Sequence, residues 1–165
     1  MANASTGAPL SINRKRIIFL VAMSLLLMSG AILFNAPEQT QIIQVKFPSG
    51  VTVDAEVADN PERRLIGLAF REELPLQGGL LYIFDHSAPH KVWTKGFLIP
   101  IDVVWIDESK QVVYLLKDVE PCAQDPCPWY GPPPENARYV LETHDGFIER
   151  EQVRIGTEVT FALQL

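Results

Sequence analysis

An uncharged, mostly apolar run near the N-terminus restricts this chain more than any other feature. It covers residues 17–34 and reads IIFLVAMSLLLMSGAILF. As a helix it would extend about 27 Å at about 1.5 Å per residue, close to the roughly 30 Å hydrocarbon core of a bilayer. The run is apolar on all sides, whereas a helix packed on a protein surface carries a polar face. We therefore predict that residues 17–34 enter or cross a membrane.

The residues around this run predict its orientation. Three bases, Arg14, Lys15 and Arg16, precede it, and a positive flank stays on the cytoplasmic side. The chain after residue 34 is then expected outside the cytoplasm. Two interpretations of residues 1–34 stay open: an uncleaved membrane anchor, or a secretory signal peptide cleaved near Ala31, where small residues follow the apolar stretch.

Charge is distributed unevenly along the chain. All 20 acidic residues follow residue 37, whereas three of the 14 basic residues lie in residues 1–34, which we call the leader. The chain after the leader therefore has 20 − 11 = 9 excess negative charges. Such a surface repels a phosphate backbone. We expect no nucleic-acid partner.

The only two cysteines, Cys122 and Cys127, lie close together in the sequence CAQDPC. In an oxidising compartment this spacing predicts a disulfide. It would lie within a loop rich in proline at residues 120–137, which we call the proline-rich loop. Two free thiols or a metal site are the alternatives. A metal site would need further ligands from His86, His90 or His144, which are distant in sequence, and we predict no metal.

Residues 42–165 have the pattern of one β-rich domain, which follows a short polar linker at 35–41. About eight strands are predicted, at 42–47, 51–57, 80–84, 91–97, 101–107, 111–119, 138–143 and 157–163. Two short helices are predicted at 61–67 and 147–153. The first begins at Pro61 with Asp59 or Asn60 as its cap, and Leu65 and Leu68 facing inward. This many short strands indicates a compact barrel-like or sandwich domain.

The most informative stretch is residues 92–107, VWTKGFLIPIDVVWID. A turn at residues 98–99 would place Lys95 opposite Asp102, with Trp93 on the same face. An aspartate between apolar strand residues must be paired or hydrogen-bonded if it is buried. We predict a Lys95–Asp102 pair, either beside an aromatic pocket wall or as a structural pair that sets the strand register.

Four blocks of residues resemble the bacterial and archaeal family called domain of unknown function 192. They are Arg64-Leu65-Ile66-Gly67-Leu68 with Arg71, Gly79-Leu80-Leu81-Tyr82-Ile83-Phe84, Trp93-x-Lys95 with Ile99-Pro100-Ile101-Asp102 and Ile106-Asp107, and Tyr139-Val140-Leu141-Glu142 with Gly146. The resemblance covers about residues 42–163. It implies a small β-rich domain, often exported, and carries no established activity.

The chain also departs from the family pattern. Ala69, Leu80 and Thr94 stand where methionine is usual, and Gly96-Phe97 replaces a common Asn-Thr pair. If that pair contacts a ligand in relatives, the resemblance implies an altered or lost site here.

Five residues are predicted to bind a ligand, and no residue is predicted to be catalytic. The five are Arg64, Trp93, Lys95, Asp102 and Glu142. Each also has a structural interpretation, such as an ion pair for Arg64 or core packing for Trp93. No nucleotide, phosphate, zinc-protease or nucleophile-elbow motif is present in the sequence, and we predict no cofactor.

Three functions remain in competition. The first is a non-catalytic domain of the cell envelope that binds a small polar ligand or a peptide. The second is a structural or interaction module that contacts another envelope protein. The third is a hydrolase of an envelope polymer or glycan, in which Asp102 and Glu142 would supply two carboxyl groups about one cleft.

Overall fold

The computed structural model describes residues 13–34 and 40–163 of the chain. It separates into two units, divided after residue 39, which we describe individually. The N-terminal unit contains helix α1 (Arg14–Phe34). No helix among the described residues is both long and apolar enough to cross a membrane. Most of the predicted linker at 35–41 lies outside the described residues.

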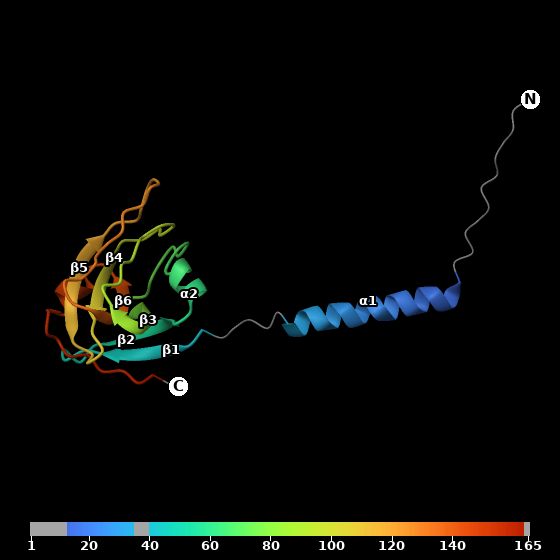
Figure 1. The fold of residues 1–165 in the computed structure, drawn as a ribbon, viewed down its shortest axis with the longest axis horizontal. Coiled ribbons are helices and arrows are strands. Elements are labelled where there is room, and N and C mark those ends of the chain that lie inside the picture. The colour runs from blue at the N-terminus through green and yellow to red at the C-terminus, as the bar shows by residue number, and fades with distance from the viewer. Residues whose placement is uncertain (1–12, 35–39, 164–165) are drawn as a thin grey trace, which may run out of the picture. The chain divides into compact units, whose positions relative to one another are not determined.

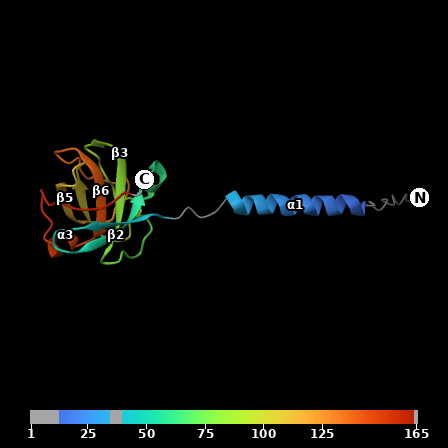
Figure 2. The ribbon, with the colours of Figure 1, turned by 90° about the horizontal axis from the view of Figure 1, so that it is seen from below.

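The second unit contains one six-stranded sheet with strand order β1-β2-β3-β6-β4-β5 (Figure 1). The strands are β1 (Ile42–Lys46), β2 (Thr52–Ala58), β3 (Gly78–Ala88), β4 (Ile101–Ile106), β5 (Val112–Val119) and β6 (Ala137–His144). Only β2 and β3 pair in parallel, and all other pairs are antiparallel. The sheet is strongly curved in both views (Figure 2).

The β-rich class is confirmed, but the prediction of a barrel-like or sandwich domain of about eight strands is wrong, because six strands form one sheet. The sheet is open, with β1 and β5 at its edges. The segment predicted as the last strand makes single bridges near both edges, from Thr160 to Lys46 of β1 and from Glu158 to Gln111, the residue before β5. The segment predicted as a strand at 91–97 pairs instead with the proline-rich loop, through Val92–Tyr130 and Lys95–Cys122.

Alternate residues of the central strands enter two separate cores. Leu81, Val104 and Leu141 belong to a core on one face of the sheet. Their neighbours Tyr82 and Trp105 belong to a core on the other face. Because successive side chains of a strand point to opposite faces, both faces of the sheet are covered. This explains why every residue of β4 is buried.

Two short helices accompany the sheet, as predicted. Helix α2 (Pro61–Ile66) begins at proline, and the Asn60 side chain accepts a hydrogen bond from the Arg63 backbone N–H at 2.9 Å. Helix α3 (Phe147–Arg150) follows Gly146, which has a positive φ of 71°. Helix α2 carries Arg64 and Leu65, which lie beside Tyr82 and Val92 of the second core. Leu65 is 63% exposed, so the prediction that it faces inward is wrong, whereas Leu68 is fully buried.

Candidate functional site

Asp102 is buried and fully engaged by the backbone. Its Oδ1 accepts the Asp118 N–H at 2.9 Å, and its Oδ2 accepts the Ile148 N–H at 2.7 Å. The prediction that a buried Asp102 must be hydrogen-bonded is confirmed, but the Lys95 partner is wrong. Asp102 therefore holds β5 and the start of α3 in place, and both carboxylate oxygens are committed to that role.

Lys95 lies instead against the proline-rich loop. Its Nζ forms an ion pair with Asp125 at 3.0 Å, and both side chains are about half exposed or more. The same Nζ lies 5.9 Å from the centre of the Trp93 ring. The turn that would have brought Lys95 opposite Asp102 does not form because residues 92–95 pair with the loop.

A pocket of about 280 Å³ opens between α2, β3 and the proline-rich loop. We call it the tryptophan pocket. Its lining residues are Pro61, Arg64, Leu65, Tyr82, Phe84, Lys91, Val92, Trp93 and Trp129. Two of the five predicted ligand-binding residues, Arg64 and Trp93, line it.

Two stacked indoles form one wall of the tryptophan pocket. The Trp93 and Trp129 ring centres are 4.6 Å apart, with 14° between the ring planes. Their backbones are fastened by a pair of hydrogen bonds between Val92 and Tyr130 at 2.8 and 3.1 Å. The predicted disulfide between Cys122 and Cys127 is present and ties the same loop together. The loop therefore delivers Trp129 to the pocket in a defined position.

Arg64 is held over the opposite aromatic wall. Its Nη1 donates to the backbone carbonyls of Asp59 at 2.7 Å and Ile83 at 2.9 Å. Its guanidinium carbon lies 5.4 Å from the centre of the Phe84 ring, within the range of a cation–π contact. The His90 ring also stacks on Phe84, and the pKa of His90 is lowered mainly by burial. Arg64 is thus fixed before any ligand arrives.

A buried acid lies beneath the pocket floor. Glu142, on β6, is fully buried, and Tyr82 donates its O–H to Glu142 Oε2 at 3.1 Å. Burial raises the pKa of Glu142 to about 8, although the Tyr82 hydrogen bond and the Arg71 charge act in the opposite direction. Oε1 has no hydrogen-bond partner among the described residues. At neutral pH Glu142 is therefore mostly a protonated carboxylic acid.

Glu56 and Arg71 form a second charged pair near this acid. The two Arg71 Nη atoms each lie 2.6 Å from a Glu56 carboxylate oxygen. The Arg71 hydrogen bonds hold the pKa of Glu56 below its ordinary value. In the sheet Glu56 pairs with Leu80, and Leu80 pairs with Glu142. The two carboxyl groups therefore lie on the same face.

The structure brings together part of the predicted site. Arg64 and Trp93 share the tryptophan pocket, Glu142 contacts its floor through Tyr82, and Lys95 lies beside its indole wall. Asp102 does not join them. It pairs across the sheet with Thr143, the neighbour of Glu142, so the Asp102 and Glu142 side chains point to opposite faces.

Four important pocket residues escaped sequence reasoning: Tyr82, Phe84, Lys91 and Trp129. Tyr82 and Phe84 belong to the block that carries the family resemblance, and their alternate spacing was the available signal for a shared face. Trp129 lies two residues after Cys127, so the predicted disulfide indicated that Trp129 belongs to an ordered loop. Nothing in the sequence showed which residue that loop approaches.

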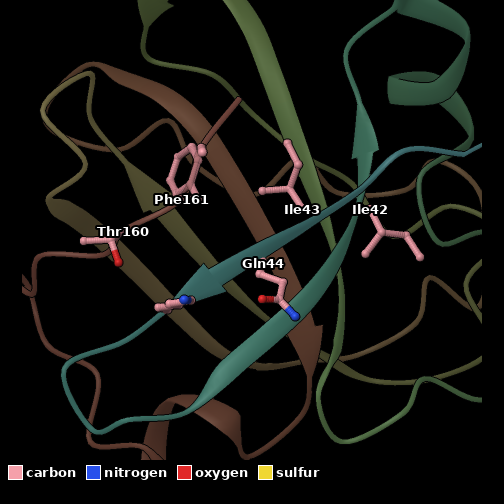
Figure 3. Close-up of a pocket in the computed structure, with 7 residues that line it drawn as sticks. Ile42, Ile43, Gln44, Thr160 and Phe161 are labelled. Atoms are coloured by element: carbon pink, nitrogen blue, oxygen red, sulfur yellow. The ribbon is translucent and has the colours of Figure 1, made fainter. Parts of the chain in front are cut away.

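The domain has a second hollow, away from the predicted site residues. A hollow of about 450 Å³ lies beside edge strand β1 and is lined by Ile42, Ile43, Gln44, Lys46, Thr160, Phe161 and Ala162 (Figure 3). It contains none of the predicted site residues. Within residues 13–34 and 40–163, no three His, Cys, Asp or Glu side chains converge as a metal site.

Comparison with known proteins assigns the chain to a family. The model of the family DUF192, described as an uncharacterized ACR, matches residues 43–161. The chain belongs to this family. Four residues of the blocks that suggested the resemblance are Arg64, Tyr82, Trp93 and Glu142. In this DUF192 domain the first three line the tryptophan pocket, and Glu142 is hydrogen-bonded to Tyr82 at its floor. No curated protein matches the chain.

Two solved structures have the same fold as this DUF192 domain. A candidate transcription regulator from Sinorhizobium meliloti 1021 superimposes with a TM-score of 0.65 at 22% identity, over 76% of this chain and 98% of that one. A protein of unknown function from Novosphingobium aromaticivorans DSM 12444 gives a TM-score of 0.62 at 21% identity, over 76% and 88%. At these identities the likeness concerns the fold alone.

Proposed function

We propose that this chain is a non-catalytic binding domain outside the cytoplasm, and that the tryptophan pocket receives a small ligand or a peptide side chain. The observation that carries the proposal is the stacked Trp93–Trp129 wall facing an Arg64 that is already anchored to backbone carbonyls. Aromatic walls with a few fixed polar groups are typical of small-molecule sites. Binding then costs little reorganisation of the protein.

The same geometry weakens the hydrolase alternative. Glycan hydrolysis by the usual route needs two carboxyl groups on either side of one scissile bond. Asp102 and Glu142 point to opposite faces of the sheet, and both oxygens of Asp102 accept backbone hydrogen bonds. These two residues therefore do not share a cleft, and binding is the better-supported function.

Two features support a location outside the cytoplasm. The Cys122–Cys127 disulfide fits an oxidising compartment, and the uncharged run at 17–34 after three bases fits export or anchoring in a membrane. In intact cells, we expect Cys122 and Cys127 to be oxidised and the domain to be cut by externally added protease once any outer layer is permeable. Reduced thiols with full protection from protease would contradict this location.

A binding screen tests the function itself. The full-length protein is screened against envelope metabolites and short peptides by thermal shift, in parallel with Trp129→Ala and Leu76→Ala variants. Trp129 and Leu76 are both largely exposed, and only Trp129 lines the tryptophan pocket. A true ligand raises the Tm of the wild type and of Leu76→Ala, but not of Trp129→Ala. Indifference to every compound, or equal stabilisation of all three proteins, would contradict the proposal.

A further inference from the structure

The tryptophan pocket has a charge opposite to that of its domain. We propose that its ligands are small anions with a compact apolar body, of the class of aliphatic or aromatic carboxylates; this rests on the binding function proposed above. The domain after the leader carries nine excess negative charges. Yet the lining of the pocket contains two cations, Arg64 and Lys91, and no Asp or Glu among the described residues.

The two cations retain free donors. Arg64 uses Nη1 for two backbone carbonyls, and no acceptor in residues 40–163 contacts its Nη2 or Nε. Lys91 is exposed and has no ion-pair or hydrogen-bond partner in the same part of the chain. Lys95, by contrast, is neutralised by Asp125. An incoming carboxylate would therefore receive charge-assisted hydrogen bonds without breaking a protein ion pair.

The rest of the pocket is suited to an apolar body of limited size. Trp93, Trp129 and Phe84 provide aromatic faces, and Leu65 is left 63% exposed at the pocket rim. The volume of about 280 Å³ lies just below the range for small-molecule sites, about 300–1,000 Å³. A single ring or a short branched chain with one carboxylate fits this description better than an extended polymer.

Charge-matched probes test the ligand class. Cyclohexanecarboxylate, cyclohexanecarboxamide and cyclohexylmethylammonium share one apolar body and do not absorb where tryptophan does. Each is titrated into the full-length protein while tryptophan fluorescence is followed, since Trp93 and Trp129 line the pocket. We expect the carboxylate to bind at least about tenfold more tightly than the amide, because its hydrogen bonds to the cations are charge-assisted, and the ammonium to bind most weakly. Added NaCl should weaken the binding of the carboxylate and not that of the other two probes.

Variants locate the effect. Lys91→Glu should weaken carboxylate binding at least about threefold, the modest size that an exposed charge contributes, and leave amide binding unchanged. Lys117→Glu, which changes an exposed lysine outside the pocket, is the matched control and should bind like the wild type. Arg64→Gln should remove most of the preference for the carboxylate and leave the smaller part that Lys91 supplies. Lys91→Glu keeps the test decisive if Arg64→Gln fails to fold.

The outcomes separate this inference from the proposed function. Equal affinity for the carboxylate and the amide, both lost in Trp129→Ala, would overturn the anion class but leave a binding pocket. Preference for the ammonium would overturn it in the same way. An unchanged tryptophan signal with all three probes would overturn the ligand class, and the metabolite and peptide screen would then decide the function on its own.

Discussion

Tyr82 and Glu142 meet inside the domain, with the phenolic oxygen 3.1 Å from Glu142 Oε2. The two strands that carry them, β3 and β6, are separated by about half of the domain sequence and pair antiparallel. This contact connects a buried acid to the floor of the tryptophan pocket, because Tyr82 lines that pocket. Burial also raises the pKa of the Tyr82 phenol, so at neutral pH the contact joins two neutral groups.

Glu142 should make stability fall as pH rises. Its pKa is about 8 in the folded protein, against an ordinary value of 4.5, so between these values the folded state binds more protons than the unfolded state. The free energy of unfolding should then decrease by at most about 1.4 kcal/mol per pH unit from this group. In urea unfolding from pH 5 to 9, Glu142→Gln should lose this slope, whereas Glu135→Gln, in an exposed position, should keep it. Parallel pH profiles for Glu142→Gln and the wild type would refute this account.

Gly67 should be needed for its lack of a side chain as well as for its backbone conformation. A Cβ added there would overlap the Tyr82 phenolic oxygen, at a φ of +57°. Gly50 also has a positive φ, +91°, but a Cβ there would meet no atom within 4 Å. Denaturant unfolding should show that Gly50→Ala costs about 1 kcal/mol and Gly67→Ala about 3 kcal/mol or more. Similar costs for the two variants would mean that the approach to Tyr82 is unimportant.

Asp102 should be a structural residue with no part in ligand binding. Asparagine has one acceptor oxygen where Asp102 uses two, so Asp102→Asn leaves the Asp118 or Ile148 N–H facing an amide donor. We expect a loss of about 1–3 kcal/mol in the free energy of unfolding and unchanged affinity for cyclohexanecarboxylate. Asp107→Asn is the control, since within residues 40–163 its carboxylate accepts one hydrogen bond, from the Gln111 N–H at 2.8 Å, and the asparagine oxygen can still accept it. Loss of ligand affinity in folded Asp102→Asn would contradict the assignment.

Removal of the disulfide should affect both stability and binding. Cys122 and Cys127 close a short loop, and the loop-entropy model assigns about 2 kcal/mol to such a closure. The double serine variant should lose about this much free energy of unfolding and bind cyclohexanecarboxylate more weakly, because the loop also positions Trp129. Ala123→Ser, in the same loop, serves as the control and should match the wild type. Unaltered affinity in the double variant would show that Trp129 keeps its position without the disulfide.

The features that could be predicted from the sequence depend on short-range chemistry. The Asn60 cap before Pro61 and the Cys122–Cys127 pairing involve residues a few positions apart, and both are present in the structure. The requirement that a buried Asp102 find hydrogen-bond donors also followed from its apolar neighbours alone. The identity of those donors did not, because the N–H groups of Asp118 and Ile148 approach only after β5 and α3 are placed.

The errors arise where tertiary pairing overrides a local pattern. The stretch around Trp93 has the composition of a strand, yet Val92 and Lys95 pair with single residues of the proline-rich loop and not with the sheet. This choice separates Lys95 from Asp102 and brings Trp93 against Trp129. The pocket could not be assembled in advance because it combines α2, β3 and two loops whose register is set by these long-range contacts.

The three indole N–H signals of the chain offer the most direct test of the tryptophan pocket as the binding site. The chain has only three tryptophans: Trp93 and Trp129 line the pocket, and Trp105 is buried with its Nε1 donating to the His90 carbonyl at 2.9 Å. In ¹⁵N–¹H spectra of the full-length protein titrated with cyclohexanecarboxylate, the Trp93 and Trp129 signals should move together along a saturable curve while Trp105 stays nearly still. Saturable shifts confined to Trp105, or to backbone signals of β1 beside the hollow of Figure 3, would contradict it.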